Sequence, residues 1–191
     1  YGFAKIFYAI SDQGVDTFHV RVPAAWENVQ FLGTRKRRDL NSTNFNATTK
    51  DFTLTLQDLA WDQYTLQVSY DLQLDDNGTT RLNLRGAHPM QKQGGELVPL
   101  ERDSGTLVIH SVDSIKLGKE TPTGLSRTDH AELEEHVRSR INHTIQLAYK
   151  YDGTDFSLEL PVSRKTELDL LNAVADYAEL TTVVTGIGQV A

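Results

Sequence analysis

The stretch that decides the fold is YTLQVSYDLQL, residues 64–74, in which an apolar or aromatic residue occupies every second position. Successive side chains of a β-strand point to opposite faces of a sheet, so this pattern predicts a strand with one buried face and one solvated face. Such strands are typical of antiparallel sheets, because parallel sheets are covered by helices on both faces. We expect this strand to be central and to share its core with the strand before it. The side chains predicted in that core are Leu66, Val68, Tyr70, Leu72, Leu54 and Leu56.

Turn sequences separate this run from shorter alternating runs on either side. Residues 12–14, 75–78 and 152–153 each end in glycine and contain Asp or Asn, and these residues supply the positive φ angles of tight hairpins. We therefore expect three hairpins, which join residues 2–10 to 16–22, 64–74 to 79–85, and 141–150 to 156–162. Further strands are expected at residues 29–33, 51–59, 105–110 and 114–119.

Two stretches interrupt the β pattern. Residues 128–142 predict a short helix, because Thr128 or Asp129 can cap its start and acidic residues crowd its first turn. Residues 166–180 fit either a helix or an irregular crossing, and the β-branched residues 181–184 favour a strand. The predicted fold is mainly β: antiparallel strands packed as one large or two small β-sandwiches, with one short helix.

Residues 86–104 predict a loop or linker, because they contain Pro89, Pro99 and two adjacent glycines with little periodicity. This segment divides the chain into residues 1–85 and residues 105–191, each expected to form a β-sandwich half or subdomain. The strand patterns run to both ends of the sequence. We therefore expect a segment of a longer, modular protein.

The composition excludes several classes of protein. The 191 residues are 39% hydrophobic and 24% charged, as in an ordinary globular protein with a buried core. Cysteine is absent, which excludes disulfide scaffolds, thiolate metal sites and cysteine nucleophiles. The net charge of −7 argues against a nucleic-acid binder. No apolar run approaches the roughly 18–20 residues of a membrane-spanning helix, so we expect membrane contact only through segments outside this sequence.

Two histidine–glutamate pairs have a spacing that suits metal ligands. His130 with Glu134, and Glu132 with His136, have the i, i+4 spacing that places two ligands on one helix face. No HExxH or comparable signature accompanies them, and a polar helix surface is the interpretation that we favour.

Catalytic signatures are missing from the sequence as well. No GxSxG motif occurs, and spacing links neither Ser104 nor Ser126 to a histidine and a carboxyl group. The acid pairs Asp75–Asp76 and Glu134–Glu135 are of a kind common at turns and helix starts, and residues 75–78 lack the flanking ligands of an EF-hand loop. Walker and Rossmann phosphate-binding motifs are absent. We therefore predict no catalytic residue, no metal ligand, no cofactor and no enzymatic activity.

Three surface features have two interpretations each. The basic run at residues 35–38 fits a charged strand edge that resists aggregation, or else a site for an anionic surface or a processing protease. Trp26 and Trp61 fit the core better than a sugar-stacking platform, so we expect Trp61 to be buried. The four N-x-[ST] sequons fit a threonine-rich β surface better than glycosylation. These sequons begin at Asn41, Asn46, Asn77 and Asn142.

The order of segments resembles a known class of protein. The segments are FHVRVPAAWENVQFLG, YTLQVSYDL, GAHPM, RDSGTLVIHS, IQLAYKYDGTDFSLELPVSR and ELTTVVTGIGQVA. This order is similar to that in β-sandwich segments of large, uncharacterised, membrane-anchored bacterial envelope proteins, which combine a G-x-L-x-[IV] strand, a tyrosine-rich hairpin and a final TxVxxxGxx strand. The resemblance implies an extracytoplasmic location, periplasmic or at the cell surface, and carries over no functional residue.

These observations favour a non-enzymatic structural or interaction module of a larger extracytoplasmic protein. Its expected partners are neighbouring modules of the same chain or another protein, and not nucleic acid. The alternative is a carbohydrate-binding module, which requires a row of exposed aromatic side chains.

Overall fold

The computed structural model describes residues 1–33, 39–75, 78–100, 103–110, 114–133, 135, 144–165, 184–186 and 189–190. The structure is mainly β: of the described residues, 72% lie in strands and 2% in a helix, and the antiparallel sheets pack against one another as in a sandwich. The fold class predicted from the alternating sequence is therefore confirmed. Two hydrophobic cores form, one inside a single folded sheet and one between two smaller sheets.

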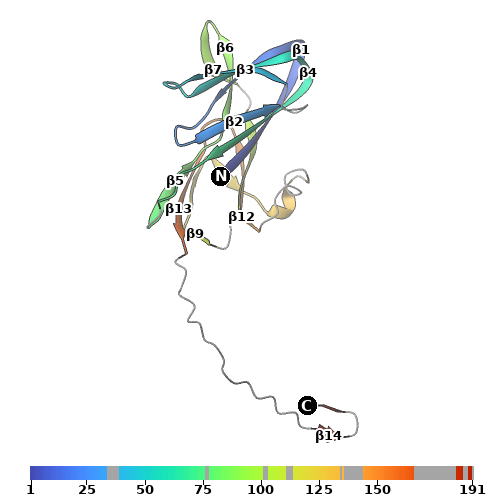
Figure 1. Ribbon diagram of the computed structural model, residues 1–191, viewed down its shortest axis with the longest axis vertical. Helices are drawn as coiled ribbons and strands as arrows, with labels where there is room; N and C mark the ends of the chain where they lie inside the picture. The colour runs from blue at the N-terminus through green and yellow to red at the C-terminus, as the bar shows by residue number, and fades with distance from the viewer. Residues whose placement is uncertain are drawn as a thin grey trace.

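The first core lies within the largest sheet, at the end of Figure 1 that carries the labels β1 to β4. Two long strands, β1 (Gly2–Arg21) and β4 (Asp51–Asp71), pair antiparallel along most of their length. The other strands of this sheet are β2 (Glu27–Gly33) and β3 (Leu40–Asn46), which pair with β4, and the hairpin of β6 (His88–Gln93) and β7 (Glu96–Pro99), which pairs with β1.

Two opposed bulges fold this sheet over on itself. In the β1–β4 register, Val15 pairs with Ala60, but residues 11–14 lie opposite Trp61, and residues 56–59 lie opposite Asp16. Extra residues on one strand of a pair bend it and increase its twist. Each long strand therefore contributes one half to each of two layers.

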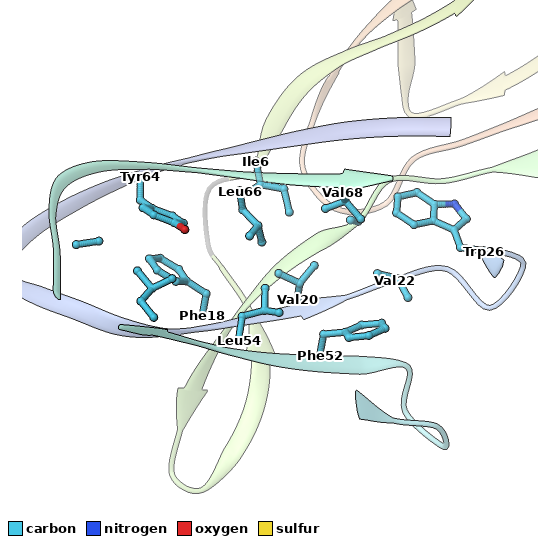
Figure 2. Packing of buried hydrophobic residues seen from close by; sticks show 13 residues of the cluster. Ile6, Phe18, Val20, Val22, Trp26, Phe52, Leu54, Tyr64, Leu66 and Val68 are labelled. Atoms are coloured by element: carbon cyan, nitrogen blue, oxygen red, sulfur yellow. The ribbon is translucent and has the colours of Figure 1, made fainter. Parts of the chain in front are cut away.

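We call these the upper and lower layers, as they appear in Figure 2. The upper layer consists of residues 2–10 and 62–70 with β2, and the lower layer of residues 17–21 and 51–55 with β3, β6 and β7.

The inward side chains of the two layers face one another and form the first core (Figure 2). Leu54, Leu66 and Val68 are 0% exposed and Leu56 is 6% exposed. Tyr70 and Leu72 are partly buried against the same cluster. The core predicted from the alternation at residues 64–74 is confirmed.

The second core lies between two small sheets. One contains β5 (Thr79–Leu84), β9 (Ile115–Leu117), β10 (Thr121–Thr123) and β13 (Ser157–Arg164), and the other contains β8 (Ser104–His110), β11 (Leu125–Arg127) and β12 (Ile145–Asp152). Leu147 and Tyr149 of β12 pack there with Leu158, Leu160 and Val162 of β13. The predicted strands at residues 29–33, 105–110 and 114–119 correspond to β2, β8 and β9.

All three predicted hairpins are wrong. Residues 2–21 form one bent strand, without a chain reversal at residues 12–14. The turn after β4 leads to β5, which pairs with β13 and not with β4. The turn at residues 152–153 joins β12 to β13, which lie in different sheets. The turn residues mark a bulge in the first case and a crossing between sheets in the other two. Alternation does not distinguish a crossing from a hairpin, because two strands that face each other across a core show the same alternation as two strands that pair.

The predicted loop at residues 86–104 is also wrong, because β6 and β7 form a hairpin there. Strand pairing does not follow the division at residue 85, since β5 joins the second sandwich and β6 joins the first. Of the helix predicted at residues 128–142, the structure shows a 3₁₀ turn, η1 (His130–Glu132), and residues 134 and 136–142 lie outside the described residues. The ambiguous segment 166–180 lies outside them too, whereas β14 (Val184–Gly186) pairs with β15 (Gln189–Val190).

Candidate functional site

The outer face of the lower layer carries polar side chains that pair across the strands. Arg21 of β1 donates from Nε and Nη2 to the two carboxyl oxygens of Asp51 on β4, at 2.7 and 3.0 Å. One row along, His19 Nδ1 lies 3.0 Å from Thr53 Oγ1. Both contacts join residues that are direct partners in the β1–β4 register. These four polar side chains therefore find partners on the face itself.

The pKa values of two groups on this face are lowered. The hydrogen bond from Arg21 holds the pKa of Asp51 below its usual value, and this effect exceeds the opposing effect of burial. Burial lowers the pKa of His19, with a further contribution from the charge of Lys92. A lowered pKa reflects the burial, the nearby charges and the hydrogen bonds of the group. Such shifts therefore occur in structural pairs as well as in active sites.

A histidine–carboxyl contact lies at the junction of the two sandwiches. His88, at the start of β6, places Nδ1 3.0 Å from Oδ2 of Asp103, immediately before β8. Phe156 is 5% exposed and lies edge-on to His88, with ring centroids 5.9 Å apart, and stacks on Tyr151 at 4.0 Å. Burial raises the pKa of Tyr151 to about 12. We call His88, Asp103, Tyr151 and Phe156 the junction cluster.

The residues considered for metal binding or catalysis are not assembled into a site by the described part of the chain. Glu132 accepts a hydrogen bond from Thr128 at 3.0 Å and lies near Lys150 on an exposed surface. Ser104 begins β8 and Ser126 lies in the middle of β11. Among the described residues no group of three or more histidine, aspartate or glutamate side chains could hold a metal ion. Glu134 and His136 lie outside the described residues.

The outer face of the upper layer is different, because it exposes large apolar side chains. Phe3 and Phe7 of β1 are 45% and 60% exposed, and Leu32 of β2 is 41% exposed. Their β4 partners are Ser69, Thr65 and Gln67, which alternate on one face, so the three apolar side chains share that face. We call Phe3, Phe7 and Leu32 the apolar strip.

The bend between the layers exposes a further aromatic ring. Trp61 is 57% exposed, so the expectation that it is buried is wrong, whereas Trp26 is 8% exposed and stacks on Tyr70 at 3.5 Å. Trp61 points outward because it belongs to the bulge, where β4 turns from one layer to the other. The signal in the sequence is the break in alternation in QDLAWDQ, residues 57–63.

A small cavity of about 70 Å³ lies beside Trp61. Its lining combines apolar and polar side chains. The polar members are Asp39, Gln57, Asp58 and Gln63, and the others are Leu56, Leu59, Ala60, Trp61 and Tyr64. We call Trp61, Leu59 and these four polar residues the bend site.

Two of the four sequons fall in the described chain. Asn41 and Asn46 are exposed on β3, and Asn46 Oδ1 accepts a hydrogen bond from the backbone N–H of Thr48 at 3.0 Å. Asn77, Asn142 and the basic run at residues 35–38 lie outside the described residues.

In comparisons with known proteins, no family model, curated protein or solved structure matches the chain. In the part of the chain that the structure describes, no helix is long and apolar enough to cross a bilayer.

Proposed function

We propose that this chain is a non-enzymatic interaction module of a larger extracytoplasmic protein, and that the apolar strip is its contact surface. The supporting observation is the contrast between the two outer faces of the first sandwich. The lower face pairs its polar groups, while the upper face leaves Phe3, Phe7 and Leu32 in solvent. Exposed apolar side chains that share one face mark a contact surface more often than the same side chains scattered singly.

The partner of this surface is a neighbouring module of the same protein or a second protein. Aromatic side chains are enriched at such contacts because they bury a large area with few rotatable bonds. The extracytoplasmic location is supported by the resemblance to envelope-protein segments and accords with the lack of cysteine.

Hydroxyl-radical footprinting tests this proposal in the protein as it occurs naturally. We expect Phe3 and Phe7 to be oxidised several-fold more slowly in the native preparation than in the isolated chain, because a partner covers them. Phe45 on β3, which is 49% exposed, is the internal control. If Phe3 and Phe7, like Phe45, are each oxidised at the same rate in the native preparation as in the isolated chain, the proposal is overturned.

Carbohydrate binding is the second candidate function, and the exposure of Trp61 favours it. The bend site offers one exposed ring, Trp61, and not the expected row, but it places that ring beside hydrogen-bonding side chains that suit sugar hydroxyls. Carbohydrate binding is tested by measuring the binding of oligosaccharides to the intact chain. If no oligosaccharide binds, this candidate function is ruled out and the interaction module is the one that remains.

A further inference from the structure

Trp61 is held in place by the backbone beneath it. A methyl group built on Gly14 would lie 2.8 Å from Cε2 and Cζ2 of the indole and 3.1 Å from Cβ of Leu59. Gly14 therefore lets the ring rest directly on the β1 bulge, and any larger residue would displace it. The indole is nevertheless 57% exposed, so much of its surface remains open to a ligand.

The bend that carries the ring is also well defined. The pair Val15–Ala60 keeps β1 and β4 in register between the two bulges. Next to Trp61, Asp62 has a φ of 59°, a left-handed conformation that Asp adopts more readily than most residues. An aromatic ring that is fixed before binding loses little conformational entropy when a ligand stacks on it.

The cavity beside the ring limits what can enter it. At about 70 Å³ it exceeds the roughly 10–15 Å³ that a single buried water needs, so a hydroxyl or hydroxymethyl group can enter it. A ligand that lies on Trp61 would therefore place a polar substituent in the cavity.

The polar lining fits hydroxyl groups. The carboxyl groups of Asp39 and Asp58 accept hydrogen bonds from hydroxyls, and the amides of Gln57 and Gln63 both donate and accept them. The same two carboxyl groups disfavour a ligand that carries a carboxylate of its own, because like charges repel. The site is suited to a ligand that combines an apolar face with neutral hydroxyls at its rim.

We infer that the bend site binds a neutral hexopyranose unit of an oligosaccharide, with the C–H face of the sugar on Trp61 and a hydroxyl or hydroxymethyl group in the cavity. This inference rests on the second candidate function and names its site and ligand class. The inference places sugar binding at the bend between the two layers, whereas the apolar strip lies on the outer face of the upper layer.

Isothermal titration calorimetry of the whole chain tests the inference. The probes are cellohexaose, maltohexaose and mannohexaose as neutral ligands, and hexagalacturonate as the acidic one. We expect saturable binding of at least one neutral probe and binding of hexagalacturonate at least about tenfold weaker, the factor that corresponds to 1.4 kcal/mol.

Four variants locate the site. Trp61→Ala should weaken binding of that probe about tenfold or more, because the stacked surface is lost. Gly14→Ala keeps the indole but displaces it, and should weaken binding several-fold. Phe45→Ala removes another exposed aromatic ring, and Trp26→Phe alters the buried tryptophan. Both should bind within about twofold of the parent, and far-UV circular dichroism establishes that each variant is folded.

The possible outcomes distinguish a wrong function from a wrong binding site and from a wrong ligand class. If no hexasaccharide binds, carbohydrate binding fails as a function and the inference fails with it. If a neutral probe binds equally to the parent and to folded Trp61→Ala, the function stands and the bend site is wrong. If hexagalacturonate binds as tightly as the neutral probes, the ligand class is wrong. In Trp26→Phe, Trp61 is the sole tryptophan, so an unchanged emission spectrum at saturation would also overturn the site.

Discussion

His88 and Asp103 join the two sandwiches through one short contact, with Nδ1 3.0 Å from Oδ2. His88 begins β6, which belongs to the folded sheet, and Asp103 directly precedes β8, which belongs to the second sandwich. Asp103 is 9% exposed, and its backbone carbonyl accepts a hydrogen bond from the N–H of Gly153 at 2.6 Å. Asp103 is therefore held through its carboxyl group by His88 of the first sandwich and through its backbone by Gly153 of the second.

We expect His88→Ala and Asp103→Ala each to lower the free energy of unfolding by about 1–3 kcal/mol, because each leaves a partly buried partner without its hydrogen bond. The double variant should lose less than the sum of the two, which a double-mutant cycle in urea measures. Asp152→Ala, at the exposed end of β12, is the control and should change stability by less than about 0.5 kcal/mol. Additive losses would mean that the two side chains act independently.

Phe156 should contribute more to this junction than the polar pair does. It is 5% exposed, stacks on Tyr151, and lies so close to Gly86 that a methyl group there would be 2.8 Å from its Cζ. Phe156→Ala should therefore cost about 3–5 kcal/mol, whereas Phe156→Leu keeps most of the volume and should cost less. Thermal and urea melts of both variants measure the difference. Equal melting of Phe156→Ala and the parent would show that the junction is not packed.

Acid should weaken the contribution of the Arg21–Asp51 pair to the stability of the fold. Asp51 has a lowered pKa in the folded chain, so its stabilising contribution is present above the pKa of an unfolded aspartate, about 3.9, and is lost as the pH falls through that value and below. His19 acts in the same direction, because its pKa is also lowered and its contribution declines below about pH 6.5. Stability should therefore fall from pH 7 to pH 3.

Urea denaturation of the parent and of Arg21→Gln over this range separates the pair from the other acidic groups. The variant lacks the guanidinium that lowers the pKa of Asp51, so it should be less stable than the parent at pH 7, and the gap should narrow towards pH 3. Thr55→Ala, a neutral change on the same outer face, should run parallel to the parent. A gap that stays constant with pH would contradict the linkage.

The sequence predicts which side chains are buried better than how the strands connect. Alternation at residues 64–74 identifies Leu66 and Val68 as core, because period-two patterning depends only on which face a side chain occupies. The same pattern is silent about whether the next strand pairs in the same sheet or crosses to the facing one. Glycine turns after β4 and β12 reverse the chain in both cases, so the expected hairpins became crossings between sheets.

The candidate sites were less accessible from the sequence. His88 and Asp103 are fifteen positions apart and share no motif, and the β6–β7 hairpin between them brings them together, beside Phe156. Trp61 follows Leu59–Ala60 and has the composition of a core segment, but the bulges turn it outward. Bulges depend on register over both long strands, which local propensity does not specify.

The second half of β4 gives the sharpest test of the first sandwich. Val68 is 0% exposed and faces the lower layer, while its neighbour Gln67 points to the outer face opposite Lys5. Val68→Asp places a carboxyl group in an apolar core without a partner, at a cost of several kcal/mol, and should abolish cooperative folding of the first sandwich. Gln67→Asp puts the same group one position away on the solvated face and should shift the melting temperature by only a few degrees. Circular dichroism melts of the two variants compare the faces directly, with near-ultraviolet signals from Trp26 reporting on the core. If Val68→Asp melts like Gln67→Asp, the inward face of β4 has been assigned wrongly and the folded sheet with it.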